Sequence, residues 1–134
     1  MTTPRARLAV LASGSGSNLQ AIRDDLVARG SAASAELALV VSDRMAAGAL
    51  ERTRGWNVAA VHLPKDQNEA LDALLQEHGI THIALAGYLR LVPIAVVRRF
   101  HGRMLNVHPA LLPAFGGPGM YGARVHAAVL AAGA

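Results

Sequence analysis

The sequence contains no cysteine, few aromatic residues and no long apolar run. The absence of cysteine excludes disulfide bonds, thiolate catalysis and most structural zinc sites, and it fits the reducing cytoplasm, where we expect this protein to be found. The apolar runs are short and interrupted by Gly, Asp and Arg, so none approaches the roughly 18–20 residues of a membrane span. We therefore expect a soluble protein with no membrane partner.

The scarcity of aromatic residues also argues against nucleic-acid binding. The chain has 13 Lys and Arg against 9 Asp and Glu, a net charge of +4, which would suit either a nucleic acid or a phosphorylated metabolite. However, the arginines form no long run, and aromatic residues at 4% leave little to stack on bases. We expect no nucleic-acid partner and favour the metabolite. A plain solvated surface is the other explanation of the scattered arginines.

What the sequence does contain is a regular alternation of apolar strands and helices. With 52% hydrophobic residues, a chain of 134 residues is long enough for one domain with an ample core. Strands are expected at residues 8–12, 36–41, 58–63, 82–86 and 104–107, and helices at 19–29, 46–54, 67–78, 93–100 and 123–132. This pattern predicts an α/β fold with an open, mainly parallel, doubly wound sheet, whose function gathers outside the carboxyl ends of the strands.

A glycine-rich loop follows the first strand. Residues 13–18 read SGSGSN and lead into a helix, so backbone N–H groups would face an anion, with Ser17 and Asn18 adding side-chain donors. A dinucleotide-binding loop would need a third glycine where Leu19 stands, and the sequence lacks the ending of a Walker loop. We therefore expect a site for a single phosphate, and a simple tight turn is the alternative.

The second strand ends at Ser42 and Asp43. Either residue could cap the helix expected at 46–54. A carboxylate at the position of Asp43 binds the ribose in NAD-binding domains, but without the third glycine we prefer the helix cap. Gly79 is expected to end the third helix.

Two polar side chains stand at the end of the fifth strand. Asn106 and His108 are two residues apart in an extended segment, so they point to the same side, and Pro109 holds His108 in the extended region. An amide beside an imidazole suits acyl transfer, because both can hold an oxyanion and the ring can also move a proton. The structural alternative is an Asn in a turn and a His that caps a carbonyl. The glycine loop, the loop around Arg90 and this pair all follow carboxyl ends of strands.

With these residues assembled, the chain resembles the glycinamide ribonucleotide formyltransferases, folate-dependent enzymes of purine biosynthesis. The motifs that carry the resemblance are GSGSNLQAI at residues 14–22, LAGYLRLV at 85–92 and LNVHPALLP at 105–113. The resemblance covers essentially the whole chain, and it implies a Rossmann-like formyltransferase fold.

The resemblance also implies which residues bind the substrates. The phosphate of glycinamide ribonucleotide would be held by Gly16, Ser17 and Asn18. The cosubstrate, 10-formyltetrahydrofolate, would bind in a pterin pocket lined by Leu89, Arg90, Leu91, Val92 and Asn106. The partners would thus be the ribonucleotide and a reduced folate, and a homodimer is compatible with this assignment.

Asn106 and His108 would be the catalytic pair. In the reaction that the resemblance implies, the substrate's primary amine attacks the formyl carbon, Asn106 and protonated His108 bind the oxyanion, and a proton passes to the departing folate nitrogen. No metal is needed.

The sequence departs from the family pattern at several positions. The arginine expected to bind the folate tail is replaced by Asn68, with Lys65 nearby as a substitute. Residues 115–122, FGGPGMYG, are longer and richer in glycine than the family's commoner version and suggest a mobile lid or its hinge. His126 is expected to be structural. The family continues beyond this chain through a catalytic aspartate and further strands, so we expect residues 1–134 to form a single formyltransferase domain that is incomplete at its C-terminus.

Other assignments stay open from the sequence. The formyltransferase of initiator methionyl-tRNA shares the stretch around Asn106 and His108, but the phosphate loop favours a small nucleotide. Formyltetrahydrofolate hydrolase would show the same pair and an additional N-terminal domain, for which a first strand at Leu8 leaves no room. A non-catalytic nucleotide- or folate-binding fragment belongs to a different class. A dehydrogenase is the weakest alternative, for want of the third glycine.

Overall fold

The computed structural model describes residues 5–45 and 47–107. In this part of the chain five parallel strands form one sheet in the order β3-β2-β1-β4-β5. The strands are β1 (Ala6–Leu11), β2 (Ala35–Ser42), β3 (Ala59–His62), β4 (His82–Ala86) and β5 (Met104–Val107). The helices are α1 (Ser17–Arg29), α2 (Gly48–Arg52), α3 (Leu71–Glu77) and α4 (Ile94–Arg99), with 3₁₀ turns η1 (Gly30–Ala32) and η2 (Lys65–Ala70). The predicted parallel α/β fold is confirmed.

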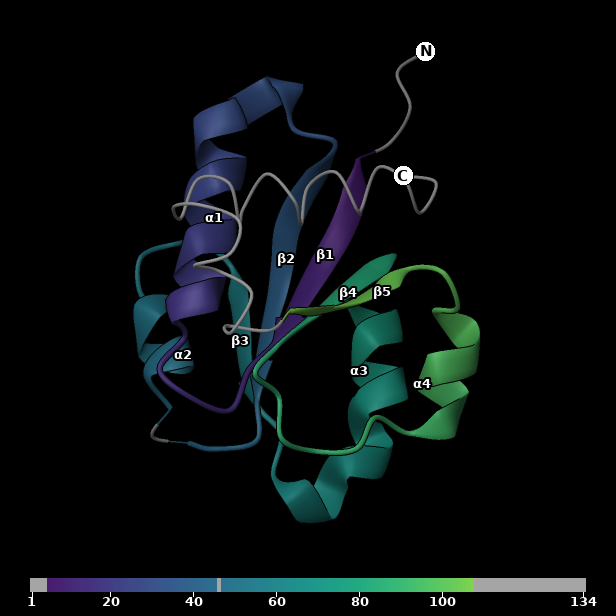
Figure 1. Ribbon diagram of the computed structural model, residues 1–134. Coiled ribbons are helices and arrows are strands. Elements are labelled where there is room, and N and C mark those ends of the chain that lie inside the picture. Colours follow the sequence, from purple (N-terminus) through teal and green to yellow (C-terminus); the bar gives the residue numbers. More distant parts are fainter. Residues whose placement is uncertain (1–4, 46, 108–134) are drawn as a thin grey trace.

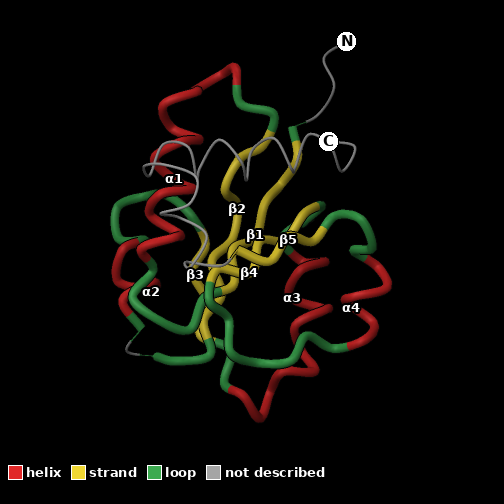
Figure 2. Tube along the Cα trace, in the orientation of Figure 1, coloured by secondary structure: helices red, strands yellow, loops and turns green. Residues whose placement is uncertain are grey.

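The central strand β1 is buried on both faces of the sheet. Leu8 and Val10 pack in the cluster beneath α1 and α2, whereas Ala9 and Leu11 pack in the cluster beneath α3 and α4. Figure 1 shows the two pairs of helices on opposite sides of the sheet, and Figure 2 shows the yellow strands running between them. This double burial accounts for the continuous apolar run from which the strand was predicted.

The strand order places the switch point of the sheet next to β1. The chain adds β2 and β3 on one side of β1 and then crosses to add β4 and β5 on the other side. The direction of growth therefore reverses between β1 and β4, and open parallel sheets bind ligands outside the carboxyl ends of such a pair. In Figure 1 the loops after β1 and β4 both leave the sheet at its lower end.

Two of the expected helices differ in detail from the structure. The helix predicted at 46–54 is shorter, because α2 begins after Ala47 and no side chain caps it. The helix predicted at 67–78 begins as the 3₁₀ turn η2, is interrupted by non-helical Gln67, and becomes α-helical only in α3. Gly79 ends α3 with a φ of +62°, as expected.

Three predicted features fall in the C-terminal segment, beyond the residues that the structure describes. The helix predicted at 123–132, the proposed lid at 115–122 and His126 lie outside the described residues. Within residues 5–45 and 47–107, no helix is long and apolar enough to cross a membrane.

His82 is a buried polar residue at the start of β4. It is 5% exposed, its Nδ1 lies 2.7 Å from Thr81 Oγ1, and its Nε2 has no hydrogen-bond partner among the described residues. Burial and, secondarily, the charge of Arg103 lower the pKa of His82 from its ordinary value of 6.5. The imidazole is therefore neutral in the folded protein at neutral pH.

We expect acid to destabilise the fold through His82. Because the pKa of His82 is lower in the folded state, the unfolded chain takes up the proton first, and stability present above pH 6.5 is lost as the pH falls toward the folded-state pKa. The melting temperature of His82→Leu should therefore fall less than that of the wild type between about pH 7.5 and about pH 5. His101→Gln, at an exposed position, should keep the wild-type dependence. Equal slopes for His82→Leu and the wild type would contradict this assignment.

Candidate functional site

The loop after β1 turns sharply into α1 and packs closely on α2. Gly16 occupies the N-cap position with a φ of +83°, a left-handed conformation that favours glycine. A Cβ on Gly16 would lie 2.7 Å from Ala49 Cα, and a Cβ on Gly48 would lie 2.7 Å from the carbonyl oxygen of Ser15. The loop and α2 therefore meet backbone to backbone, and a side chain at either glycine would force them apart.

The N-terminus of α1 has the features of an anion site. The helix has no side-chain cap hydrogen bond and no acidic residue in its first turn, so its N-terminal dipole is not compensated there. Ser17 is exposed, whereas Asn18 is 6% exposed. The strand, glycine loop and helix are thus arranged as expected, and the phosphate-binding roles of Gly16, Ser17 and Asn18 stay predictions.

Arg52 of α2 is hydrogen-bonded to the glycine loop and to α1. Its Nε donates to the carbonyl oxygen of Ser15 at 2.7 Å, and its Nη1 donates to Gln20 Oε1 at 3.3 Å. The Ala49 N–H donates to the carbonyl oxygen of Gly14 at 3.2 Å. These bonds turn the loop carbonyls toward α2. No sequence motif indicated this role for Arg52, because the contacts join segments distant in the chain.

Hydrogen bonds on both sides anchor the loop that follows β4. The Leu89 N–H donates to Ser13 Oγ at 2.9 Å, which joins this loop to the glycine loop. On the other side, Asn68 Nδ2 donates to the carbonyl oxygen of Leu91 at 2.7 Å, and Asn68 Oδ1 accepts from the Tyr88 hydroxyl at 3.3 Å. Asn68, which stands where the resemblance led us to expect an arginine, therefore shapes the loop.

Apolar side chains of this loop and of α4 are exposed to solvent. Leu89 is 61% exposed, Leu91 90% and Ile94 69%. Val92, in contrast, packs against the cluster beneath α3 and α4. Grouped apolar side chains that face solvent are typical of binding surfaces, and the predicted folate pocket includes Leu89 and Leu91.

Arg90 turns away from its exposed neighbours and forms an ion pair with Asp43. The distance from Arg90 Nε to Asp43 Oδ2 is 3.0 Å, and the Asp43 side chain is only 4% exposed. The prediction that Asp43 or Ser42 caps the second helix was wrong: Asp43 is engaged by Arg90, and Ser42 Oγ accepts the N–H of Arg44 at 3.2 Å. Neither side chain is left to cap α2.

The Asp43–Arg90 pair also acts on Tyr88. Burial, and then the negative charge of Asp43, raise the pKa of Tyr88, while Arg90 opposes this effect. The phenol is therefore protonated at neutral pH and can donate to Asn68.

Asn106 lies on β5, on the face of the sheet where the β4 loop packs. Its neighbours Leu105 and Val107 pack with the cluster beneath α1 and α2. Because strand side chains alternate, the exposed Asn106 belongs to the opposite face, where Tyr88 packs. His108 lies outside the described residues, so the expected pairing of Asn106 with His108 stays a prediction.

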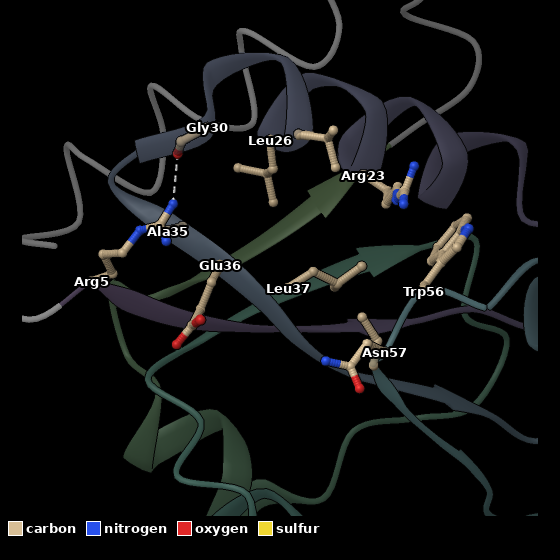
Figure 3. A pocket seen from close by; sticks show the side chains of 11 residues that line it. Arg5, Arg23, Leu26, Gly30, Ala35, Glu36, Leu37, Trp56 and Asn57 are labelled. Atoms are coloured by element: carbon tan, nitrogen blue, oxygen red, sulfur yellow. Dashed lines mark hydrogen bonds between the residues drawn. The ribbon is translucent and has the colours of Figure 1, made fainter. Parts of the chain in front are cut away.

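A separate cleft of about 310 Å³ lies against the start of β2, away from the carboxyl ends of the strands. Two arginines border it in Figure 3. Arg23 stacks on the ring of Trp56, with its guanidinium carbon 4.9 Å from the ring centroid, and Arg5 Nη2 donates to the carbonyl oxygen of Gly30 at 2.7 Å. Because both cations already have partners in the protein, we do not place the functional site here.

The features at the strand ends define a class of protein. A parallel α/β sheet that carries a glycine loop, a tethered loop after β4 and a polar residue on β5 around its switch point is a ligand-binding domain, suited to a molecule with both an anionic and an apolar part. Within the described residues there is no group of three or more His, Cys, Asp or Glu side chains that could hold a metal ion.

The chain belongs to the formyl transferase family, which matches residues 6–134. It is 39% identical, over 97% of its length, to the chloroplastic phosphoribosylglycinamide formyltransferase of Arabidopsis thaliana, and spans 47% of that protein. It is 37% identical to the Bacillus subtilis phosphoribosylglycinamide formyltransferase, over 95% of this chain and 68% of that protein. The crystal structure of glycinamide ribonucleotide transformylase 1 from Symbiobacterium toebii superposes with a TM-score of 0.71 and 42% identity, over 84% of this chain and 56% of that one.

Proposed function

We propose that the chain transfers a formyl group from 10-formyltetrahydrofolate to the primary amine of glycinamide ribonucleotide, in purine biosynthesis. The observation that carries the proposal is the joining of the two loops at the switch point, where Ser13 of the glycine loop accepts the N–H of Leu89. This bond sets a phosphate-type loop beside an exposed apolar surface, which matches a substrate with a phosphate and a cosubstrate with a flat ring. The names of the relatives support the same activity.

In this reaction each of the two loops would bind one substrate. The glycine loop would bind the ribonucleotide phosphate through Gly16, Ser17 and Asn18, and the β4 loop would hold the pterin ring. The substrate amine then forms a bond to the formyl carbon, and Asn106 and protonated His108 hold the resulting oxyanion. The bond from that carbon to the folate nitrogen breaks, the amine loses a proton and the folate nitrogen gains one.

The structure gives a physical reason to prefer this function to a dehydrogenase. Leu19, which replaces the third glycine of a dinucleotide loop, is fully buried in the core beneath α1. The carboxylate of Asp43, which could bind a ribose, is occupied by Arg90. Neither requirement of an NAD site is met.

Calorimetry tests the proposal directly. The chain is titrated in turn with glycinamide ribonucleotide, a reduced folate and NAD. We expect the first two to bind and NAD not to bind. Binding of NAD alone would contradict the proposal, and binding of the ribonucleotide without transfer of a formyl group would support a non-catalytic binding fragment.

Asn18→Leu should raise the Michaelis constant for the ribonucleotide by roughly tenfold, with little effect on the constant for the folate. Leucine has a similar volume but cannot donate to a phosphate, and a hydrogen bond to a charged group is worth about 1.5–3 kcal/mol. The control is a phosphate-free analogue of the substrate, whose affinity should not depend on this substitution. If the analogue lost as much affinity as the real substrate, the loop would not be a phosphate site.

The proposal also covers the localisation and the oligomeric state of the protein. We place the protein in the cytoplasm, and we propose that it forms a homodimer. Fractionation of cells and light scattering of the purified protein test these two statements separately.

A further inference from the structure

Asp43 and Arg90 form a bridge across the end of the central strand. Asp43 follows β2 and Arg90 lies in the loop after β4, and these two strands are the neighbours of β1 on its opposite sides. The ion pair, at 3.0 Å, therefore spans the carboxyl end of β1, where the glycine loop begins. No other ion pair within the described residues joins the loops at this end of the sheet.

This bridge is not arranged for maximal stability. Asp43 Oδ1 and Arg90 Nε are buried, and neither makes a directed hydrogen bond within the described part of the chain, although Nε lies close to Oδ2. Buried charges with unsatisfied atoms lose much of the Coulomb energy to desolvation, and apolar residues of similar volume are often as stable. The ion pair is therefore weak evidence of a stabilising role, all the more because the Arg90 side chain is 33% exposed to solvent.

Arg90 lies between two tethered points of the β4 loop. The loop backbone is tied down on either side of Arg90, at the N–H of Leu89 and at the carbonyl of Leu91. With these two points fixed, the inward turn of the Arg90 side chain toward Asp43 leaves Leu89 and Leu91 facing outward, at 61% and 90% exposure. If the guanidinium were released, the loop could rotate about its two anchors and withdraw this surface.

We propose that Asp43 is a positioning residue for the folate: it holds the Arg90 guanidinium across the end of β1 and thereby keeps the β4 loop in the orientation that presents Leu89 and Leu91 to the pterin ring. Asp43 acts through Arg90 and does not touch the ligand. This inference rests on the proposed function, because it names the cosubstrate of that site.

The first test needs no ligand. Trypsin cleaves after arginine, and the ion pair should withhold Arg90 from the protease. We expect Asp43→Asn to speed cleavage between Arg90 and Leu91 by roughly tenfold. An effect of this size is within the range of interaction energies found for residues in one ion pair. Cleavage after the exposed Arg54 is the internal standard. The matched control is Asp25→Asn, which removes a different Asp–Arg pair, 2.9 Å apart on α1, and should leave cleavage after Arg90 unchanged.

The second test measures binding by calorimetry. Asp43→Asn should weaken the binding of a reduced folate by roughly tenfold and leave the binding of glycinamide ribonucleotide unchanged within about twofold. Arg90→Gln should weaken folate binding as well, and the double variant should bind folate no more weakly than Arg90→Gln alone. Circular dichroism checks that each variant is folded. If Asp43→Asn is not folded, Asp43→Glu replaces it, with an expected folate affinity between those of the wild type and Arg90→Gln.

The outcomes separate the inference from the proposed function. If the wild type binds a reduced folate and Asp43→Asn binds it equally well, the inference is wrong and the proposed function stands. Additive losses in the double variant would likewise show that Asp43 does not act through Arg90. If the wild type binds no reduced folate, the proposed function is contradicted and the inference about its cosubstrate falls with it.

Discussion

Alanine at Asn106 or at His108 is expected to slow formyl transfer by about 10²–10³-fold while the affinity for glycinamide ribonucleotide stays nearly unchanged. Both side chains are assigned to the oxyanion, whose charge develops only as the substrate amine attacks the formyl carbon. Their loss should therefore lower kcat without a matching change in ground-state binding. Steady-state kinetics gives kcat, and calorimetry gives the dissociation constant of the ribonucleotide.

The control for His108→Ala is His101→Ala. His101 is exposed and lies before β5 in the sequence, so the control removes an imidazole to which the proposal gives no part in the reaction. It should leave kcat unchanged. A parallel loss of binding and turnover in Asn106→Ala would instead indicate that this amide supports the strand end, as in the structural alternative.

The sheet could be predicted from the sequence because its signal is local. Each strand of a doubly covered parallel sheet must be apolar on both faces, so runs such as the one from Leu8 to Leu11 stand out without any knowledge of their partners. The glycine loop was predictable for a similar reason, since Gly16 and the helix that follows it are neighbours in the chain.

The contacts that shape the site could not be predicted, because they join distant segments. Asp43 looked like a helix cap, since the sequence shows only its distance from the next helix; the structure shows that Arg90 engages it instead. From the sequence, Asn68 was noted only because it replaces the arginine expected in the family. In the structure its side chain donates a hydrogen bond to the carbonyl oxygen of Leu91. Arg52 carried no signal, because an arginine on a short helix gives no indication that it holds the Ser15 carbonyl.

Gly16→Ala is expected to lower the free energy of unfolding by about 3 kcal/mol and to weaken ribonucleotide binding by roughly tenfold or more. The left-handed backbone costs an L-residue about 1–2 kcal/mol, and forcing an extra carbon into a packed contact costs about 1–3 kcal/mol. The added Cβ would lie 2.7 Å from Ala49 Cα, a backbone atom that cannot swing aside, so α2 must move. That movement would also displace Arg52, which holds the loop. Denaturant unfolding measures the first effect and calorimetry the second.

Two other glycines separate the causes of this expected loss. Gly14→Ala lies in the same loop, but it has no positive φ and nothing within 4 Å of the added carbon, so it should resemble the wild type in stability and binding. Gly87→Ala, with a φ of +76° and equally open space, should show the backbone cost alone, about 1–2 kcal/mol. If Gly16→Ala were no more damaging than Gly87→Ala, the close approach of the loop to α2 would contribute nothing to stability. If it destabilised the fold and left ribonucleotide binding intact, the conformation of this loop would not be what recognises the phosphate.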